Sequence, residues 1–88
     1  MNWKDRYNFP TEISEGMIFG FKHEDISDKP DDWDDSAFRG SLGKIFKVKE
    51  LVPEDYDNSI RLCEINDTWT NWHMDYAFLK EHFDYIRV

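Results

Sequence analysis

The clearest alternation of apolar and polar positions along the chain lies in residues 44–52. Phe46 and Val48 fall on one face of an extended segment there, whereas Lys47 and Lys49 fall on the other. A period of two residues is typical of a β-strand with one buried face. The pattern therefore predicts a strand over 44–52, with the period interrupted near both of its ends.

A second segment with this period, residues 59–65, is expected to pair with the first. Ile60 and Leu62 would point inward there, and Arg61 would point outward. The residues between the two segments, 53–58, are rich in proline, aspartate and asparagine, which favour turns. We therefore expect a β-hairpin whose loop is longer than the tight two-residue type.

Three further strands and one helical turn follow from the remaining pattern. Residues 16–22 are rich in β-forming side chains, and Gly20 among them predicts a bulge or tight curvature. Residues 68–74 carry β-branched and aromatic side chains and predict another strand, and residues 83–88 predict the last one. Between these two strands, residues 75–82 predict a short helical turn.

The length of 88 residues indicates one domain, residues 1–88. Residues 1–15 show neither a strand nor a helix period and are expected to form an N-terminal arm, with residues 16–88 as the folded body. Aromatic residues make up 17% of the chain. Each aromatic side chain buries on the order of 150–250 Å², so a few of them suffice to build a core.

Five short strands, a long loop after the first and a helical turn before the last resemble the order of an SH3-like small β-barrel. The successive strands would be residues 16–22, 44–52, 59–65, 69–74 and 84–88. The resemblance implies a mainly β, five-stranded barrel in which the long loop and the hairpin loop flank a groove. The strand signature and the paired tryptophans of signalling SH3 domains are absent, so recognition of proline-rich peptides is not implied. A short acidic chain rich in aromatic residues is also similar to small bacteriophage proteins, without pointing to a specific family.

The densest charge pattern lies in residues 24–35, where seven carboxylates and one lysine occupy twelve positions around Trp33. Like charges at this density repel one another and favour an open, solvated backbone. We therefore expect a long acidic loop after the first strand. Its negative charge makes it a candidate surface for a positively charged partner.

The formal net charge of −8 argues against direct binding to nucleic acid or to anionic lipid, because both depend on lysine and arginine. A basic protein surface is the expected partner, for example that of a DNA- or RNA-binding enzyme. The single Cys63 indicates a reducing compartment, and no signal-peptide pattern or membrane span is found in the sequence. These features predict the cytoplasm, or the host cytoplasm for a phage protein, and a monomer.

The sequence does not support catalysis or a cofactor. His23, His73 and His82 lack the spacing of a zinc site, and the aspartate runs that begin at Asp32 and Asp55 lack the glycine and final acid of an EF-hand loop. No nucleophile–histidine–acid arrangement and no phosphate-binding glycine loop is found in the sequence. We therefore expect no catalytic residue, no metal and no cofactor, and we predict that the chain is not an enzyme.

Two interpretations of the acidic run remain open. In the first, the run keeps the protein soluble and monomeric through its net charge. In the second, it imitates the row of charges of a nucleic-acid backbone and occupies a basic groove, with Trp33 or Tyr56 as an aromatic anchor. The second interpretation makes the chain a phage-encoded inhibitor or modulator of a nucleic-acid-handling host protein. The partner-binding residues it predicts are Glu24, Asp25, Asp28, Asp31, Asp32, Trp33, Asp34, Asp35, Glu54, Asp55, Tyr56 and Asp57.

Two alternative functions belong to other classes. An immunity-type or accessory subunit would bind one protein through an apolar surface formed by Trp69, Trp72 and Tyr76. A structural or assembly protein would self-associate and show a mass above the 10.7 kDa of one chain.

Overall fold

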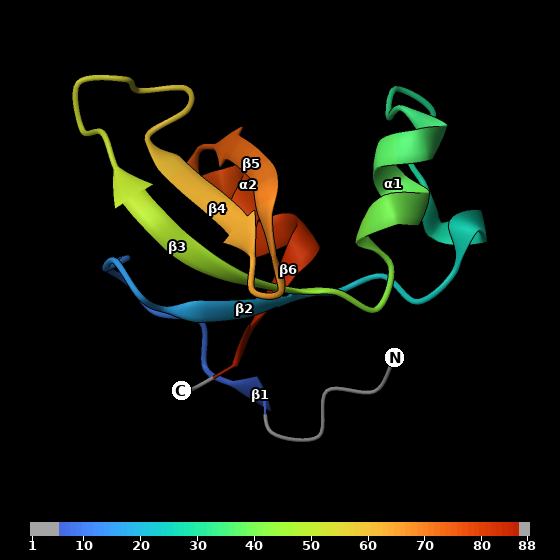
Figure 1. Ribbon diagram of the computed structural model, residues 1–88, viewed down its shortest axis with the longest axis horizontal. Helices are drawn as coiled ribbons and strands as arrows, with labels where there is room; N and C mark the ends of the chain where they lie inside the picture. The colour runs from blue at the N-terminus through green and yellow to red at the C-terminus, as the bar shows by residue number, and fades with distance from the viewer. Residues whose placement is uncertain (1–5, 87–88) are drawn as a thin grey trace.

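A computed structural model describes residues 6–86, of which residues 6–7 and 67–70 are described through their backbone alone. Six strands form one open, antiparallel sheet in the order β1-β6-β2-β3-β4-β5 (Figure 1). The strands are β1 (Arg6–Tyr7), β2 (Ile18–Phe21), β3 (Ile45–Leu51), β4 (Ile60–Glu64), β5 (Asp67–Met74) and β6 (Phe83–Ile86). The mainly β class is confirmed, whereas closure into a barrel stays a prediction.

The predicted hairpin is formed by β3 and β4. Phe46 and Val48 are buried and Lys47 and Lys49 are exposed, as the alternation predicts. The pairing of β3 with β4 shifts between Val48 and Glu50, which accounts for the interrupted period near the end of β3. The bulge predicted at Gly20 is wrong, because Gly20 pairs in regular register with both of its neighbouring strands.

The N-terminal arm is attached to the sheet. β1 pairs with β6, so residues 6–7 extend the sheet rather than lying outside it. The Phe9 ring lies 5.6 Å from that of Phe19 and 5.5 Å from that of Tyr76, measured between centroids. The hydroxyl of Tyr76 donates a hydrogen bond of 2.6 Å to the carbonyl of Pro10. Through these contacts, residues 9 and 10 lie against the core.

The segment predicted as a long open loop contains two helices, which corrects that prediction. A 3-10 helix, η1 (Ile26–Asp28), and an α-helix, α1 (Asp35–Ser41), lie between β2 and β3. Charge repulsion does not prevent these helices, because aspartates also cap helices and because Phe38 gives α1 an apolar side that is fully buried. The helical turn predicted over residues 75–82 is confirmed as α2 (Tyr76–His82).

The core is built mainly from phenylalanine. Five phenylalanines and three aliphatic residues have less than 2% of their surface exposed. They are Phe19, Phe21, Phe38, Phe46, Phe83, Leu62, Leu79 and Val48. Of the two α-helices, neither is long and apolar enough to cross a membrane, and the same holds for every helix in residues 6–86.

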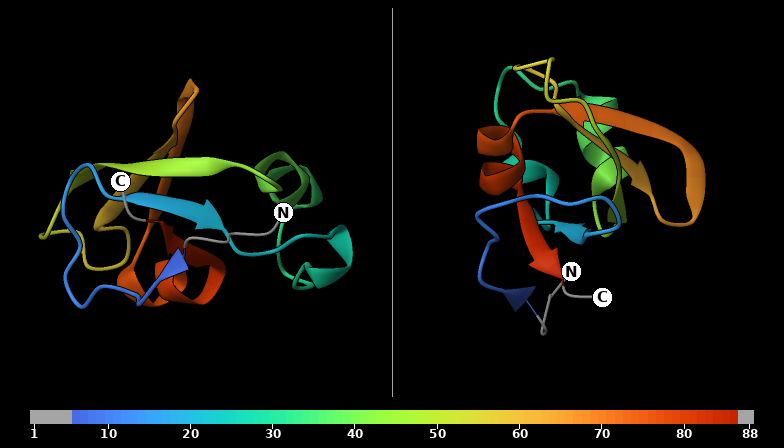
Figure 2. Two further views of the ribbon diagram at one scale, coloured as in Figure 1. Left: turned by 90° about the horizontal axis from the view of Figure 1, so that it is seen from below. Right: turned by 90° about the vertical axis from the view of Figure 1, so that its left-hand side faces the viewer.

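The two loop regions that the predicted partner-binding surface combines, the acidic residues before α1 and the loop between β3 and β4, lie at opposite ends of the molecule. The overall dimensions are 33 × 28 × 23 Å. Figure 1 shows α1 and the acidic residues before it at one end of the long axis, and the loop between β3 and β4 at the other end. The view from below in Figure 2 shows the same separation. The elements α2 and β5 lie between the two ends.

Candidate functional site

The acidic segment, defined as residues 24–35, presents its carboxylates to solvent. All seven acidic side chains are exposed, as the sequence predicts: Glu24, Asp25, Asp28, Asp31, Asp32, Asp34 and Asp35. The desolvation cost of a buried carboxylate is therefore avoided at every one of these positions. The segment thus forms a negatively charged surface that a cationic partner can reach.

Trp33 holds the acidic segment against the body of the domain. Its half-buried ring stacks on Phe78, with centroids 5.3 Å apart and an angle of 9° between the planes. It also meets the rings of Trp72 at 5.6 Å and His82 at 4.8 Å. The ammonium group of Lys29 donates to the backbone carbonyl of Trp33 at 3.1 Å. Trp33 is therefore an internal attachment point, and of the two aromatic residues predicted as anchors, Tyr56 is the more exposed.

Two of the aspartates fix the local backbone. The carboxylate of Asp25 accepts a hydrogen bond from the backbone N–H of Ser27 at the start of η1, and Asp34 accepts one from Ala37 at the start of α1, both at 3.2 Å. Such a cap supplies a partner for a helix N–H group that otherwise has none, and is worth about 1 kcal/mol. Repelling charges thus become compatible with an ordered segment.

The hairpin loop, defined as residues 53–58, carries the second group of predicted residues. Glu54 and Asp57 are exposed, and Tyr56 is 88% exposed. Asp55 is half-buried, and its carboxylate accepts a hydrogen bond of 3.3 Å from the backbone N–H of Asn58. Because this loop lies at the far end of the long axis, it does not extend the charge row of the acidic segment.

Two histidines that lie far apart in the sequence meet beneath Trp33. Nε2 of His23 lies 2.9 Å from Nδ1 of His82, a hydrogen bond in which one ring donates and the other accepts. His82 is 6% exposed, and this burial lowers its pKa. Glu81 opposes the lowering of this pKa, whereas His23 and Lys22 add to it. Among the side chains that the structure describes, in residues 8–66 and 71–86, no group of three or more His, Cys, Asp or Glu that could hold a metal ion is found.

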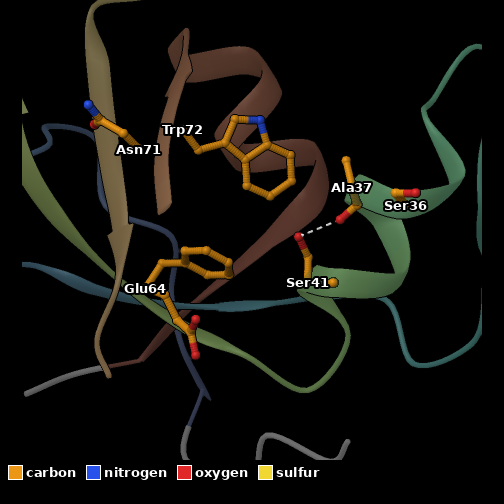
Figure 3. A pocket seen from close by; sticks show the side chains of 8 residues that line it. Ser36, Ala37, Ser41, Glu64, Asn71 and Trp72 are labelled. Carbon is orange, nitrogen blue, oxygen red and sulfur yellow. Dashed lines mark hydrogen bonds between the residues drawn. The ribbon is translucent and has the colours of Figure 1, made fainter. Parts of the chain in front are cut away.

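A pocket of about 300 Å³ lies between α1 and the sheet, and the sequence analysis did not identify it (Figure 3). Its helix wall consists of small residues, and its sheet wall consists of two aromatic rings, an amide and a carboxylate. The lining residues are Ser36, Ala37, Gly40, Ser41, Phe46, Glu64, Asn71 and Trp72. The small residues of the pocket are spaced in the sequence as residues on one face of a helix are. A helix predicted over residues 35–41 would therefore have placed them side by side and indicated this open face.

The aromatic surface of the alternative interpretation is mostly turned inward. Trp72 and Tyr76 are half-buried, and Trp72 contacts the core rings of Phe46 and Phe83 at 5.9 and 5.5 Å. The side chain of Trp69 lies outside the described part of the structure. An exposed apolar face made by these residues is therefore not seen in the part that is described.

Comparison with known protein families, with curated proteins and with solved structures found no match to this chain.

Proposed function

We propose that the chain is a non-enzymatic protein-binding module whose acidic segment occupies a basic surface of another protein. One observation carries this proposal: seven exposed carboxylates sit on a segment that Trp33 attaches to the core. An attached segment loses less conformational freedom on binding than an open loop would, so more of the electrostatic attraction appears as affinity. A charge row of this kind also raises the rate of association with a cationic partner.

The expected partner is a protein that normally binds DNA or RNA. The basic groove of such a protein accommodates a row of phosphates, and a row of carboxylates on a small domain imitates that row. By this proposal the chain inhibits or modulates a nucleic-acid-handling protein and is encoded by a bacteriophage. The hairpin loop with Tyr56 then provides a separate contact rather than a continuation of the row.

A capture experiment with two charge-matched variants tests the proposal. In D31N/D32N/D35N three exposed acids of the segment become neutral, while the cap at Asp34 stays. The control E12Q/E15Q/E81Q neutralises three exposed acids elsewhere and changes the net charge by the same amount. Each protein is immobilised and exposed to cell lysate, and the bound proteins are identified by mass spectrometry at low and high salt.

The expected result is a basic nucleic-acid-binding protein that wild type and control retain and the D31N/D32N/D35N variant loses. Raising the salt to about 1 M, where the screening length is about 3 Å, should release it, and so should added duplex DNA. Equal retention by all three proteins would contradict the proposal. A complex that survives high salt and depends on Trp69, Trp72 or Tyr76 would favour the immunity-type alternative, and a light-scattering mass above 10.7 kDa would favour assembly.

A further inference from the structure

The pocket beside α1 is open on its helix side because that wall consists of small residues. A Cβ atom added at Gly40 would meet no atom within 4 Å. The hydroxyl of Ser41 is already satisfied, because it donates a hydrogen bond of 2.9 Å to the carbonyl of Ala37 within the helix (Figure 3). The helix therefore contributes space rather than polar recognition.

The sheet side supplies the chemistry of recognition. The rings of Trp72 and Phe46 line the pocket together with Glu64, whose side chain is only 13% exposed. Figure 3 shows the Trp72 indole on the sheet side, pointing toward the wall formed by Ala37 and Ser41, and the Glu64 side chain below it in this view. An aromatic face next to a largely buried carboxylate is a suitable environment for a cation with an apolar stem.

The size of the pocket limits the ligand. About 300 Å³ lies at the lower end of the range for sites that hold a whole drug-sized molecule. A single long side chain fits this volume better. Among cationic side chains, arginine matches best, because its planar guanidinium group stacks on aromatic rings and forms paired hydrogen bonds with a carboxylate.

One cation of the chain itself already lies near this carboxylate. Nζ of Lys44 is 3.4 Å from Oε1 of Glu64, and the Lys44 side chain is 46% exposed. Because the lysine end of this ion pair is well exposed to solvent, the pair contributes little, and an entering guanidinium group can replace the ammonium group. Lys44 is thus a weak internal competitor for the pocket.

We propose that the pocket between α1 and the β4–β5 edge binds an arginine side chain of the basic partner. The choice of partner rests on the proposed function, whereas the pocket chemistry stands on Trp72, Phe46 and Glu64. The acidic segment would attract the partner over a distance, and the pocket would then hold one of its arginines. Because α1 directly follows the acidic segment, one partner surface can reach both.

A blocked peptide with one arginine, acetyl-Gly-Arg-Gly-amide, serves as the probe, and its citrulline counterpart is the neutral control of nearly the same shape. Binding is followed by two-dimensional amide NMR of the labelled full chain, including the indole N–H of Trp72. We expect saturable shifts at Trp72, Gly40 and Glu64 with an affinity of roughly millimolar, as a single side chain allows. The citrulline peptide should bind about tenfold more weakly, because it lacks the charge-assisted hydrogen bonds.

Three variants make the assignment specific. Glu64→Gln should weaken arginine binding about tenfold, and Gly40→Leu should abolish it by filling the pocket. Lys44→Met should strengthen binding, because the competing cation is gone. Equal shifts with citrulline, unchanged binding by Gly40→Leu, or weaker binding by Lys44→Met would each overturn the proposal, the last because Lys44 would then support binding of the arginine peptide instead of competing with it.

The test distinguishes this inference from the proposed function. The D31N/D32N/D35N variant should lose the captured protein partner but still bind the arginine peptide at high salt. Absence of pocket shifts in a chain that still captures a basic protein would overturn the arginine site alone. Pocket binding in a chain that captures nothing would instead contradict the role of the acidic segment.

Discussion

Mild acidification should destabilise the domain through His82. This side chain is 6% exposed, and the rings of Trp33 and Phe78 lie 4.8 and 4.6 Å from its own. Its Nδ1 atom shares a hydrogen bond with Nε2 of His23 at 2.9 Å. A proton on His82 would place a positive charge in this buried, aromatic environment.

The direction of the pH effect follows from the lowered pKa of His82. The unfolded chain titrates at the ordinary histidine value of about 6.5 and therefore binds a proton before the folded chain does. Stability is then fully present above that pH and decreases as the pH falls toward the folded pKa. The loss is up to about 1.4 kcal/mol for each unit by which the folded pKa lies below 6.5. A domain of this size has a total free energy of unfolding of only roughly 5 to 10 kcal/mol.

Urea unfolding between pH 8 and pH 5, monitored by tryptophan fluorescence, measures this loss. The variant His82→Asn keeps a hydrogen-bond acceptor near the position of Nδ1 but cannot be protonated. Its midpoint should therefore change less with pH than that of the wild type, by about 0.5–1 M urea for a difference of about 1.4 kcal/mol. The control His73→Asn removes an exposed histidine on β5 and should follow the wild type. The reasoning is refuted if His82→Asn and wild type lose stability in parallel.

Three further predictions concern glycines, the attachment of the acidic segment and its cap. A Cβ atom would fit at both Gly40 and Gly16, but Gly16 has a φ of +91°, which strains any other residue. Thermal unfolding should therefore show that Gly40→Ala raises the free energy of unfolding by about 0.5–1 kcal/mol and that Gly16→Ala lowers it by about 1–2 kcal/mol. Trp33→Ala should lower the free energy of unfolding by about 2–4 kcal/mol and should speed amide hydrogen exchange in α1 more than in β3. An equal increase of the exchange rate in both elements would argue against a local attachment. Asp34→Ala should destabilise by about 1 kcal/mol and Asp34→Asn hardly at all, because asparagine caps as well as aspartate; equal losses would assign the effect to charge.

The strands could be predicted because their alternation is a local property. Phe46 and Val48 alternate with Lys47 and Lys49 whatever the rest of the chain does, and their burial follows that pattern. The exposure of the acidic residues could be predicted for the same reason, since an isolated carboxylate is costly to bury. Closure of the sheet could not be derived in this way, because it depends on how the edge strands meet.

The helices η1 and α1 could not be predicted because two local patterns in this part of the sequence favour opposite structures. The charge density predicts an open chain, whereas Asp34 as a cap and Phe38 on the inner side of α1 favour a helix. The position of Trp33 depends on Phe78, and that of His23 on His82, 59 residues further along the chain. Contacts between residues this far apart in the sequence leave no periodic pattern, so the attachment of the acidic segment could not be predicted from the sequence.

The stacking of Trp33 on Phe78 links events at the surface to the integrity of the whole domain. A ligand that binds the carboxylates on either side of this ring also restrains the ring itself. Such a ligand therefore makes unfolding of the core less frequent. By thermodynamic linkage, a change that destabilises the core through this contact must weaken binding of that ligand by the free energy that couples the two. Resistance to heat would therefore report occupancy of the surface, even for a ligand that touches no core residue.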